Sequence, residues 1–311
     1  MEQALYSGVV PYVSTLQRFS LDDGPGIRTT VFFKGCNLHC AWCHNPECIP
    51  TGTTLQFLEN NCVGCGKCAA VCPQSVHSLT PEGGHTLSRS LCIACGKCVH
   101  DCPHGALNLI GSQYAPEELV NQLLRDRRYY ETSGGGVTFS GGEPMLHPAY
   151  LAQVLCLCKK AELHTAVDTA GCVPFKSFET VLPWVDLFLY DIKLWDEERH
   201  RLATGVSNRR ILENLRLLTD AGGSVFIRTP VIPGYNAERE ELGHIAAFLA
   251  ELPHRESIRL IQLLPYHSYG VGKYRSLGSV SRTEALRPPE DRFLQDALQL
   301  YLDLGLPAQI S

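Results

Sequence analysis

Three closely spaced cysteines form the first group of residues that could carry chemistry. Cys36, Cys40 and Cys43 follow the spacing C-x3-C-x2-C on one short stretch. Thiolates this close together can converge on one soft metal centre. A complete iron–sulfur site would need one more cysteine, and a closed zinc site one more ligand. The motif therefore predicts a centre with one open position for a substrate or cofactor. The alternative is a redox or zinc motif completed by a ligand elsewhere.

A duplicated cysteine run predicts two further centres. Cys62-x2-Cys65-x2-Cys68-x3-Cys72-Pro73 recurs as Cys92-x2-Cys95-x2-Cys98-x3-Cys102-Pro103. This is the spacing of bacterial two-cluster ferredoxins, in which the fourth cysteine of each run ligates the other cluster. One [4Fe–4S] cluster is therefore expected on Cys62, Cys65, Cys68 and Cys102, and a second on Cys92, Cys95, Cys98 and Cys72. A pair of zinc ribbons is the alternative, although zinc ribbons lack the x3-Cys-Pro ending.

Cysteine usage and charge narrow the class of protein. Most of the 15 cysteines fall into these three groups, which indicates metal ligation rather than a disulfide framework. The net charge of −5 disfavours a broad nucleic-acid interface. No apolar run approaches the roughly 18 residues of a membrane span, and no signal peptide is visible. We therefore expect a cytoplasmic protein that binds neither nucleic acid nor membrane. Open iron–sulfur centres are sensitive to oxidants, so we expect it to work anaerobically.

Strand and helix signals alternate along much of the 311-residue chain. Apolar segments predict six strands, at 29–35, 137–140, 164–168, 187–193, 224–230 and 258–264. Helices are predicted at 115–124 and near 148–161, whereas residues 1–28 read as polar and then turn-rich. The alternation favours a parallel sheet. Apolar strands that end in polar clusters suit an open, partial barrel with its site at the carboxyl ends of the strands.

Two short motifs connect the cysteines to a known family. The stretch 23–28 reads D-G-P-G-I-R just before the first predicted strand, and 141–144 reads G-G-E-P directly after the second. With Trp42 immediately before Cys43, these motifs resemble the radical S-adenosylmethionine (SAM) family. Within it, the chain resembles the glycyl radical enzyme activating enzymes, of which pyruvate formate-lyase activating enzyme is a member. The resemblance extends from about residue 16 to the end of the chain.

The resemblance implies a fold and a division into domains. The expected fold is an α/β partial (β/α)6 radical SAM barrel with an inserted bacterial-ferredoxin-like α+β domain. The barrel would be discontinuous, formed by residues 1–58 and 112–311. Residues 59–111 would form the insert that binds two clusters.

The resemblance also implies an activity, that of an oxidoreductase with three [4Fe–4S] clusters. In the family, the open iron of the Cys36–Cys40–Cys43 cluster chelates SAM, and one electron splits the sulfonium. The resulting 5′-deoxyadenosyl radical abstracts a hydrogen atom from a glycine of a partner glycyl radical enzyme. Flavodoxin or ferredoxin would supply electrons through the insert, and the protein would be a monomer.

Family motifs also imply the SAM contacts. The expected contacts are Trp42, Gly141, Gly142, Glu143, Asp168, Asp191, Lys193, Arg228 and His267. The glycines let backbone groups approach SAM closely, and the two aspartates would also frame a monovalent cation. Alternatives are a helix N-cap for Asp168, a surface cation for Lys193 and an ordinary loop histidine for His267.

Asp23 is the residue expected to contact the partner's glycine loop, because family members admit that loop beside D-G-P-G-I-R. The alternative is a turn that only positions the following strand. The ferredoxin-like insert is absent from pyruvate formate-lyase's own activase, whereas activases of dehydratases, decarboxylases and C–N or C–S lyases commonly carry it. The insert therefore disfavours pyruvate formate-lyase as the partner.

Two rival functions follow from the same cysteines. A radical SAM enzyme acting on a small molecule is one, but D-G-P-G-I-R and the two-cluster insert argue against it. A non-catalytic electron carrier is the other, but a carrier needs neither an open-iron triad nor the G-G-E-P motif. Among the remaining cysteines, Cys156, Cys158 and Cys172 are expected to be buried free thiols, and Cys48 lies close to the cluster loop.

Overall fold

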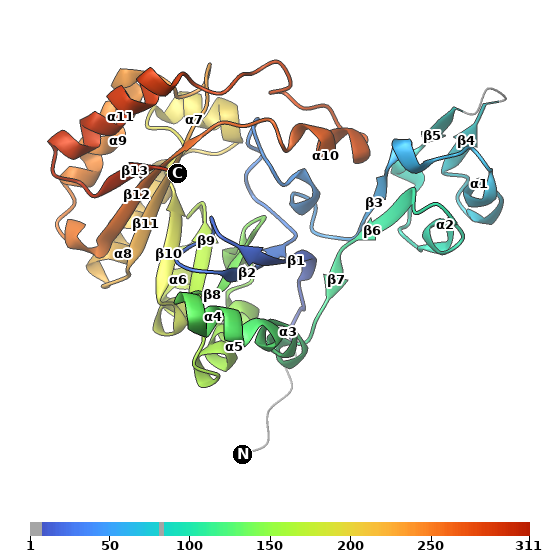
Figure 1. The fold of residues 1–311 in the computed structure, drawn as a ribbon, viewed down its shortest axis with the longest axis horizontal. Helices are drawn as coiled ribbons and strands as arrows, with labels where there is room; N and C mark the ends of the chain where they lie inside the picture. Colours follow the sequence, from blue (N-terminus) through green and yellow to red (C-terminus); the bar gives the residue numbers. More distant parts are fainter. Residues whose placement is uncertain (1–7, 81–83) are drawn as a thin grey trace.

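The computed structural model describes residues 8–80 and 84–311, and its main element is a nine-stranded sheet (Figure 1). The strand order is β13-β12-β11-β10-β9-β8-β2-β1-β7. The strands are β1 (Tyr12–Ser20), β2 (Arg28–Phe33), β7 (Ser112–Gln113), β8 (Gly136–Gly141), β9 (His164–Thr169), β10 (Leu187–Asp191), β11 (Val225–Val231), β12 (Ile258–Pro265) and β13 (Ala308–Ile310). Neighbours from β2 to β13 pair in parallel, whereas β1 pairs antiparallel with β2 and β7.

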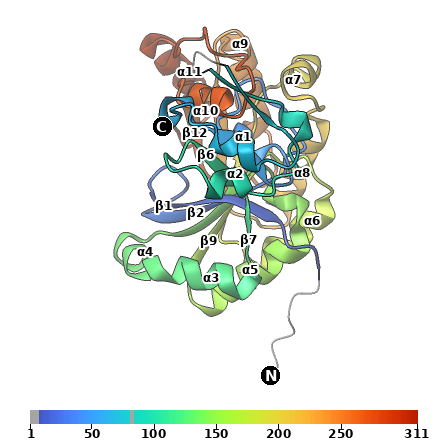
Figure 2. The same cartoon turned by 90° about the vertical axis from the view of Figure 1, so that its right-hand side faces the viewer.

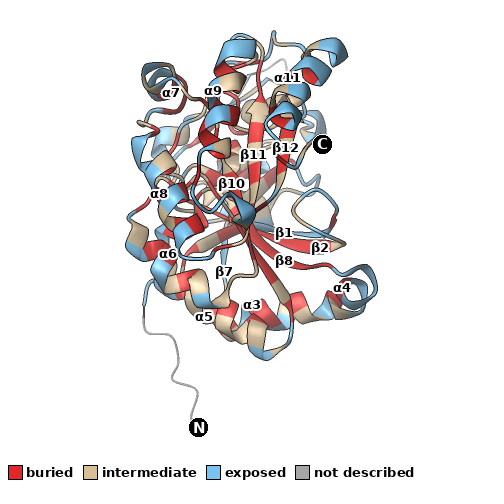
Figure 3. Cartoon of the chain, turned by 90° about the vertical axis from the view of Figure 1, so that its left-hand side faces the viewer, coloured by how far each residue is buried: buried red, intermediate tan, exposed pale blue. Residues whose placement is uncertain are grey.

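Helices cover the outer face of this sheet. They are α3 (Pro116–Leu123), α4 (Arg127–Ser133), α5 (Pro148–Lys160), α6 (Phe175–Val181), α8 (Arg209–Asp220), α9 (Arg239–Ala250) and α11 (Asp291–Asp303). Two further helices, α7 (Glu197–Thr204) and α10 (Val271–Ser276), instead bond to the segment that carries the first three cysteines. In α8, Ile211, Leu215 and Leu218 are buried at helical spacing. Figure 3 shows the buried residues concentrated on the strands and on the helix sides that face them.

The central parallel strands are apolar because both of their faces are covered. Every residue of β2 is buried. Val31 and Phe33 face the helix layer and join the main hydrophobic core. Thr30 and Arg28 on the other face bind side chains near the site instead. A strand of this kind can therefore deliver the cysteine loop from a rigid base.

The six predicted barrel strands and the two predicted helices are confirmed as β2, β8, β9, β10, β11, β12, α3 and α5. The prediction that residues 1–28 are only polar and turn-rich is wrong, because β1 occupies Tyr12–Ser20. Most of β1 is exposed or half-buried, so its sequence lacks the apolar pattern of a central strand. β7 and β13 are short edge strands that the sequence pattern did not indicate.

A small second unit is inserted between β2 and α3 (Figure 1). It contains β3 (Thr54–Phe57) paired antiparallel with β6 (Leu107–Ile110), β4 (His77–Leu79) paired with β5 (His85–Leu87), and the short helices α1 (Lys67–Val71) and α2 (Lys97–His100). Among its described residues, the buried hydrophobic cluster consists of Leu55, Leu107, Cys68 and Cys98, and Val76 and Ala106 are buried as well. So small a core suits a unit whose folding is supported by metal ligation. Figure 2 shows the insert in front of the barrel when viewed from its own side.

Candidate active site

A cavity of about 850 Å³ lies at the carboxyl ends of the parallel strands. Its walls include the cysteine loop and the ends of five consecutive strands, β8 to β12. The predicted site residues that line it are Cys36, Cys40, Trp42, Cys43, Gly141, Gly142, Asp168, Asp191, Lys193, Arg228 and His267. The fold thus brings together residues that are far apart in the sequence, at the position where α/β barrels carry their sites.

The cysteine loop is held on two sides by backbone hydrogen bonds. The N–H groups of Gly35 and Cys36 donate to the carbonyls of Cys48 and Ile49, at 2.7 and 3.1 Å. On the other side, His39 N–H donates to Thr204 O at the end of α7, at 2.7 Å. These contacts fix the backbone that carries the three thiols, as a preorganised ligand loop requires.

The three thiols of this loop must lose their protons when they bind a metal cluster. Burial raises the pKa of Cys36 and of Cys43 to about 12, and burial also raises the pKa of Cys40. The metal-free thiols are therefore protonated at neutral pH, and a metal centre must displace those protons. All three cysteines are free and line the same cavity, so the donor set fits an iron–sulfur centre with one open position.

Gly141 and Gly142 allow the second loop to pack directly on the cysteine loop. Gly141 has a φ of 104°, and a β-carbon there would overlap the backbone of Phe33. A β-carbon at Gly142 would overlap the carbonyl oxygen of Gly35. Only glycine at both positions brings this backbone to the cavity wall.

Glu143 lies behind this wall rather than in it. Its side chain is fully buried and is not among the residues that line the cavity. The carboxylate accepts hydrogen bonds from Thr169 Oγ1 at 2.8 Å and from Ala170 N–H at 2.9 Å. Burial raises the pKa of Glu143 to about 7. In this structure Glu143 joins the glycine loop to the end of β9.

Four charged side chains form acid–base pairs on one wall of the cavity. Lys193 Nζ donates to Asp191 at 2.6 Å, and Arg228 Nη1 lies 3.4 Å from Asp168. Burial raises the pKa of Asp168 to about 6, and Ser140 Oγ donates to its carboxylate at 2.6 Å. Asp168 lies in β9 rather than at a helix N-cap, and Lys193 is 12% exposed rather than a surface cation. Paired charges of both signs suit a zwitterionic ligand.

Asp23 faces inward from the loop before β2. Its carboxylate accepts hydrogen bonds from Ser20 Oγ at 2.5 Å and from Thr30 Oγ1 at 2.8 Å, and it lies 3.8 Å from Arg228 Nη1. Its neighbours Asp22 and Gly24 line the cavity, but Asp23 itself does not. The D-G-P-G-I-R stretch therefore forms part of the cavity rim, with Asp23 bonded beneath it.

Aromatic rings occupy the side of the cavity near the third cysteine. Trp42 is buried and packs edge to face on Tyr235, with ring centroids 5.0 Å apart. His267 packs against His44 with the rings tilted by 32° and their centroids 4.1 Å apart, and the Nε2–H of His44 donates to the His267 carbonyl at 3.0 Å. Burial lowers the pKa of His44 to about 4, so this ring is neutral. Such a surface suits a flat heteroaromatic group.

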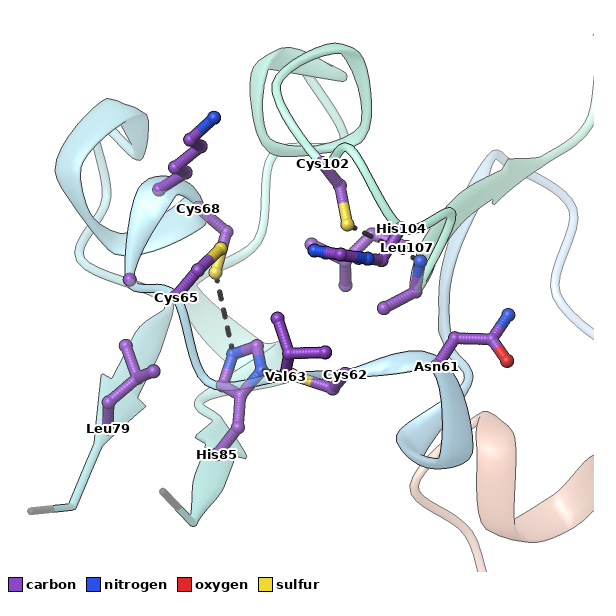
Figure 4. Close-up of a pocket in the computed structure, with 13 residues that line it drawn as sticks. Asn61, Cys62, Val63, Cys65, Cys68, Leu79, His85, Cys102, His104 and Leu107 are labelled. Carbon is purple, nitrogen blue, oxygen red and sulfur yellow. Dashed lines mark hydrogen bonds between the residues drawn. The ribbon is translucent and has the colours of Figure 1, made fainter. Parts of the chain in front are cut away.

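The eight cysteines of the insert line two separate pockets. The first insert pocket is lined by Cys62, Cys65, Cys68 and Cys102, and the second by Cys72, Cys92, Cys95 and Cys98. The fourth cysteine of each run thus lies with the first three of the other run. Figure 4 shows the first insert pocket, with the imidazole of His85 directed toward the sulfur of Cys68.

Helix α10 connects the cysteine loop to the insert. Tyr274 donates its hydroxyl proton to the carbonyl of Cys43 at 3.0 Å. Two residues after Tyr274, Ser276 accepts two hydrogen bonds from the side of the insert. Its carbonyl accepts from Arg89 Nη2 at 2.9 Å, and its Oγ accepts from Gln56 Nε2 at 3.1 Å. The insert is therefore bonded to the same short helix that supports the third cysteine.

Several of these residues were not singled out by the sequence motifs. His44 adjoins Cys43 and could have been noticed for that reason. Tyr274 carries no sequence signal, because its contact with Cys43 spans 231 positions. His77 and His85 of the insert stand out only when the two cysteine runs are compared position by position.

The four remaining cysteines have different surroundings. Cys48 is 1% exposed and its sulfur lies 3.1 Å from Ser14 Oγ. Cys158 is buried as expected, but the expectation of burial is wrong for Cys156 and Cys172, which are half-buried. Cys156 lies on α5 one residue from the core-facing position Leu155, and Cys172 lies in the loop after β9.

Two family models match the chain. The Radical SAM superfamily model matches residues 93–246, and the 4Fe-4S dicluster domain model matches residues 61–106. The solved structure of a radical SAM methyltransferase from Sphaerobacter thermophilus is similar to this chain, with a TM-score of 0.55 and 14% sequence identity. The match covers 96% of this chain and 76% of the methyltransferase chain. The likeness shows a shared fold.

Characterised relatives match over nearly the whole chain. The trans-4-hydroxy-L-proline dehydratase activating enzyme of Clostridioides difficile is 41% identical, over 94% of this chain and 96% of the relative. The choline trimethylamine-lyase activating enzyme of Oleidesulfovibrio alaskensis is 40% identical over 86% of both chains. The benzylsuccinate synthase activating enzyme of Thauera aromatica is 42% identical, over 86% of this chain and 82% of the relative.

Proposed function

Since the chain belongs to the glycyl radical enzyme activating enzymes of the radical SAM family, we propose that Cys36, Cys40 and Cys43 ligate its catalytic [4Fe–4S] cluster. The observation that carries this proposal is the cavity in which the three thiols meet Gly142, Asp168 and Arg228 from separate strands. Three cysteine ligands leave one iron for SAM.

The enzyme activates a glycyl radical enzyme. Once bound, the cluster and SAM together supply a 5′-deoxyadenosyl radical, which removes a hydrogen atom from a glycine of the partner. The protein's own contribution is to bind, orient and shield the reacting groups. Relatives of nearly equal identity are named for a dehydratase, a lyase and a synthase. The ferredoxin-like insert disfavours pyruvate formate-lyase as the partner.

The acid–base wall is the proposed site for the amino acid part of SAM. Lys193 and Arg228, which line the cavity, would meet its carboxylate, and the Gly141–Gly142 backbone would meet its amino end. Asp168 and Asp191 would also hold a monovalent cation, since both are half-buried carboxylates that line the same cavity. Trp42 and His267 are the proposed neighbours of the adenine.

The insert is the proposed electron relay, with one [4Fe–4S] cluster in each insert pocket and hence three clusters per chain. Residues 59–111 would form this domain, with 1–58 and 112–311 forming the barrel and β3 and β6 joining the two. Both joining strands meet the second insert pocket first, through Leu55 and Leu109. Electrons from flavodoxin or ferredoxin would therefore pass from the first insert pocket to the second and then to the barrel.

The remaining proposals concern the setting of the enzyme. Among residues 8–80 and 84–311, no helix combines the length and the apolar character needed to cross a bilayer. We propose a monomer in the cytoplasm that binds no nucleic acid, because thiolate-ligated clusters persist in a reducing compartment and the chain carries a net charge of −5.

Formation of 5′-deoxyadenosine tests the proposed catalytic cluster. The anaerobically reconstituted, reduced protein is mixed with SAM, and the nucleoside is quantified by chromatography. Wild type should form 5′-deoxyadenosine, and Cys40→Ala should form none, whereas Cys156→Ala should match wild type. Equal product from Cys40→Ala and wild type would contradict the ligand assignment, and no product from any of them would favour an electron carrier.

A further inference from the structure

The two halves of the insert differ at two positions that the internal repeat makes comparable. Seven residues before the first cysteine of each run stand Leu55 and His85. Five residues after the last cysteine of each run stand His77 and Leu107. At each position one half has a leucine and the other half has a histidine. A purely structural lining needs neither histidine, since leucine fills the same place in the other half.

Each histidine lines one insert pocket. His85 lines the first insert pocket beside Leu79 and Leu107, and His77 lines the second beside Leu55 and Leu109. His77 is only 6% exposed. The two rings therefore stand between the two proposed clusters, each beside two leucines.

Short contacts join the rings to each other and to a cysteine sulfur. His85 Nδ1 lies 3.3 Å from Cys62 Sγ, and His85 Nε2 lies 3.0 Å from His77 Nδ1. A longer separation of 3.8 Å lies between His85 Nε2 and Cys68 Sγ. Within residues 8–80 and 84–311, His77 Nε2 is buried without a hydrogen-bond partner.

One arrangement of protons satisfies these contacts when both rings are neutral. A cysteine that ligates iron is a thiolate and can only accept, so His85 Nδ1 must carry the proton. The lone pair on His85 Nε2 then accepts from His77 Nδ1–H. This leaves His77 Nε2 as the unprotonated nitrogen of that ring.

We propose that His85 donates a hydrogen bond to the Cys62 ligand and thereby raises the reduction potential of the cluster in the first insert pocket above that of the cluster in the second. Hydrogen bonds to cluster sulfurs stabilise the reduced, more negative state. His77 is the positioning residue, because it fixes the tautomer and orientation of His85, as outer-shell partners of metal ligands do. The inference rests on the proposed ligation of two clusters by the insert.

Potentiometric titration of the insert clusters tests this inference. The full-length chain is prepared with Cys36, Cys40 and Cys43 replaced by alanine, so that only the insert clusters contribute to the electron paramagnetic resonance signal. His85→Leu introduces the residue that the repeat carries at Leu55. The higher of the two reduction potentials should fall by at least about 59 mV. For a one-electron couple, this shift is a tenfold change in the ratio of reduced to oxidised cluster. The lower potential should stay in place.

Three further variants separate hydrogen bonding from packing. His85→Asn keeps an N–H donor near the position of Nδ1 and should retain most of the wild-type potential. His77→Leu should lower the same potential by less than His85→Leu does. His104→Gln is the matched control, since His104 is an exposed histidine of the same pocket and Gln74 is its counterpart in the repeat. Its potentials should equal those of the parent.

Specific outcomes would overturn the inference. Unchanged potentials in His85→Leu would do so, as would equal shifts in His85→Leu and His104→Gln. Strong hyperfine coupling from 15N-labelled histidine would show that a histidine ligates the metal directly, which would contradict the proposed hydrogen bond. Cys68, His77 and His85 lie close enough together for such ligation. Iron well below about eight atoms per chain would instead contradict the two-cluster ligation itself, so the two failures are distinguishable.

Discussion

The carboxylate of Asp23 lies 3.8 Å from Arg228 Nη1, and the same nitrogen lies 3.4 Å from Asp168. The loop before β2 is thus linked electrostatically to the wall of the cavity. Two half-buried carboxylates share one guanidinium, which is the group best suited to such pairing. A residue expected to meet the partner is therefore connected to the residues expected to meet SAM.

Asp23→Ala should separate these two roles. Arg228 keeps Asp168 as a partner, so SAM affinity should stay close to wild type. The glycyl radical yield on the partner should fall by roughly ten- to a hundredfold, since loss of a charge-assisted contact costs about 1.5–3 kcal/mol. SAM binding is measured by equilibrium dialysis and the radical by electron paramagnetic resonance. Asp22→Ala, on the exposed rim, is the control. A drop in SAM affinity with unchanged radical yield per bound SAM would contradict the assignment of Asp23.

Iron content should report all three proposed clusters. Anaerobic reconstitution should give about twelve iron atoms and twelve sulfides per chain, from three [4Fe–4S] clusters. Replacing Cys65 and Cys95 should remove about eight of the irons. Saturation at a single cluster in the wild-type chain would contradict the assignment of the insert.

Glu143 should make stability fall as the pH rises. Burial raises its pKa from 4.5 to about 7, so the folded protein keeps a proton that the unfolded chain releases between these values. Its contribution is complete below about pH 4.5 and is lost as the pH passes 7, by an amount on the order of 3 kcal/mol. In Glu143→Gln, the decline of the unfolding midpoint between pH 5 and 7.5 should be shallower. Asp168, whose pKa burial also raises, preserves part of the slope. Parallel profiles for the two proteins would show that Glu143 is ionised throughout.

Electron delivery should depend on the insert only when the donor is a protein. In the double variant Cys65→Ala and Cys95→Ala, activation driven by flavodoxin or ferredoxin should be lost, because SAM and the partner would cover the proposed catalytic cluster during turnover. A small, strong chemical reductant should still yield 5′-deoxyadenosine, because the Cys36–Cys40–Cys43 loop is intact. Circular dichroism and residual iron establish that the variant is folded. Full activity with the protein donor would make the insert a docking surface instead of a relay.

The barrel could be predicted because its signals are local. Strands such as β2 and β10 are buried on both faces and therefore read as continuous apolar runs. The cysteine spacings were equally informative, since ligand geometry restricts them. β1 was missed because it is a largely exposed strand, and β13 because three residues carry little pattern.

The parts of the site that escaped prediction depend on long-range contacts. Glu143 belongs to the G-G-E-P motif, yet its carboxylate turns to Thr169 and Ala170 rather than to the cavity. Tyr274 supports Cys43 from a helix near the end of the chain. Such roles follow from packing between elements, which neither motif nor periodicity encodes.

Transfer of a hydrogen atom from the partner's glycine to the SAM-derived 5′-deoxyadenosyl radical, which gives 5′-deoxyadenosine, tests the central claim most directly. Glycyl radical enzymes from the same organism are produced with glycine deuterated at Cα and incubated with the reduced protein and SAM. The 5′-deoxyadenosine should gain one deuterium, measured by mass spectrometry, in proportion to the glycyl radical seen by electron paramagnetic resonance. Nucleoside that carries no deuterium, with no radical on any of these enzymes, would contradict the claim that the chain activates a glycyl radical enzyme.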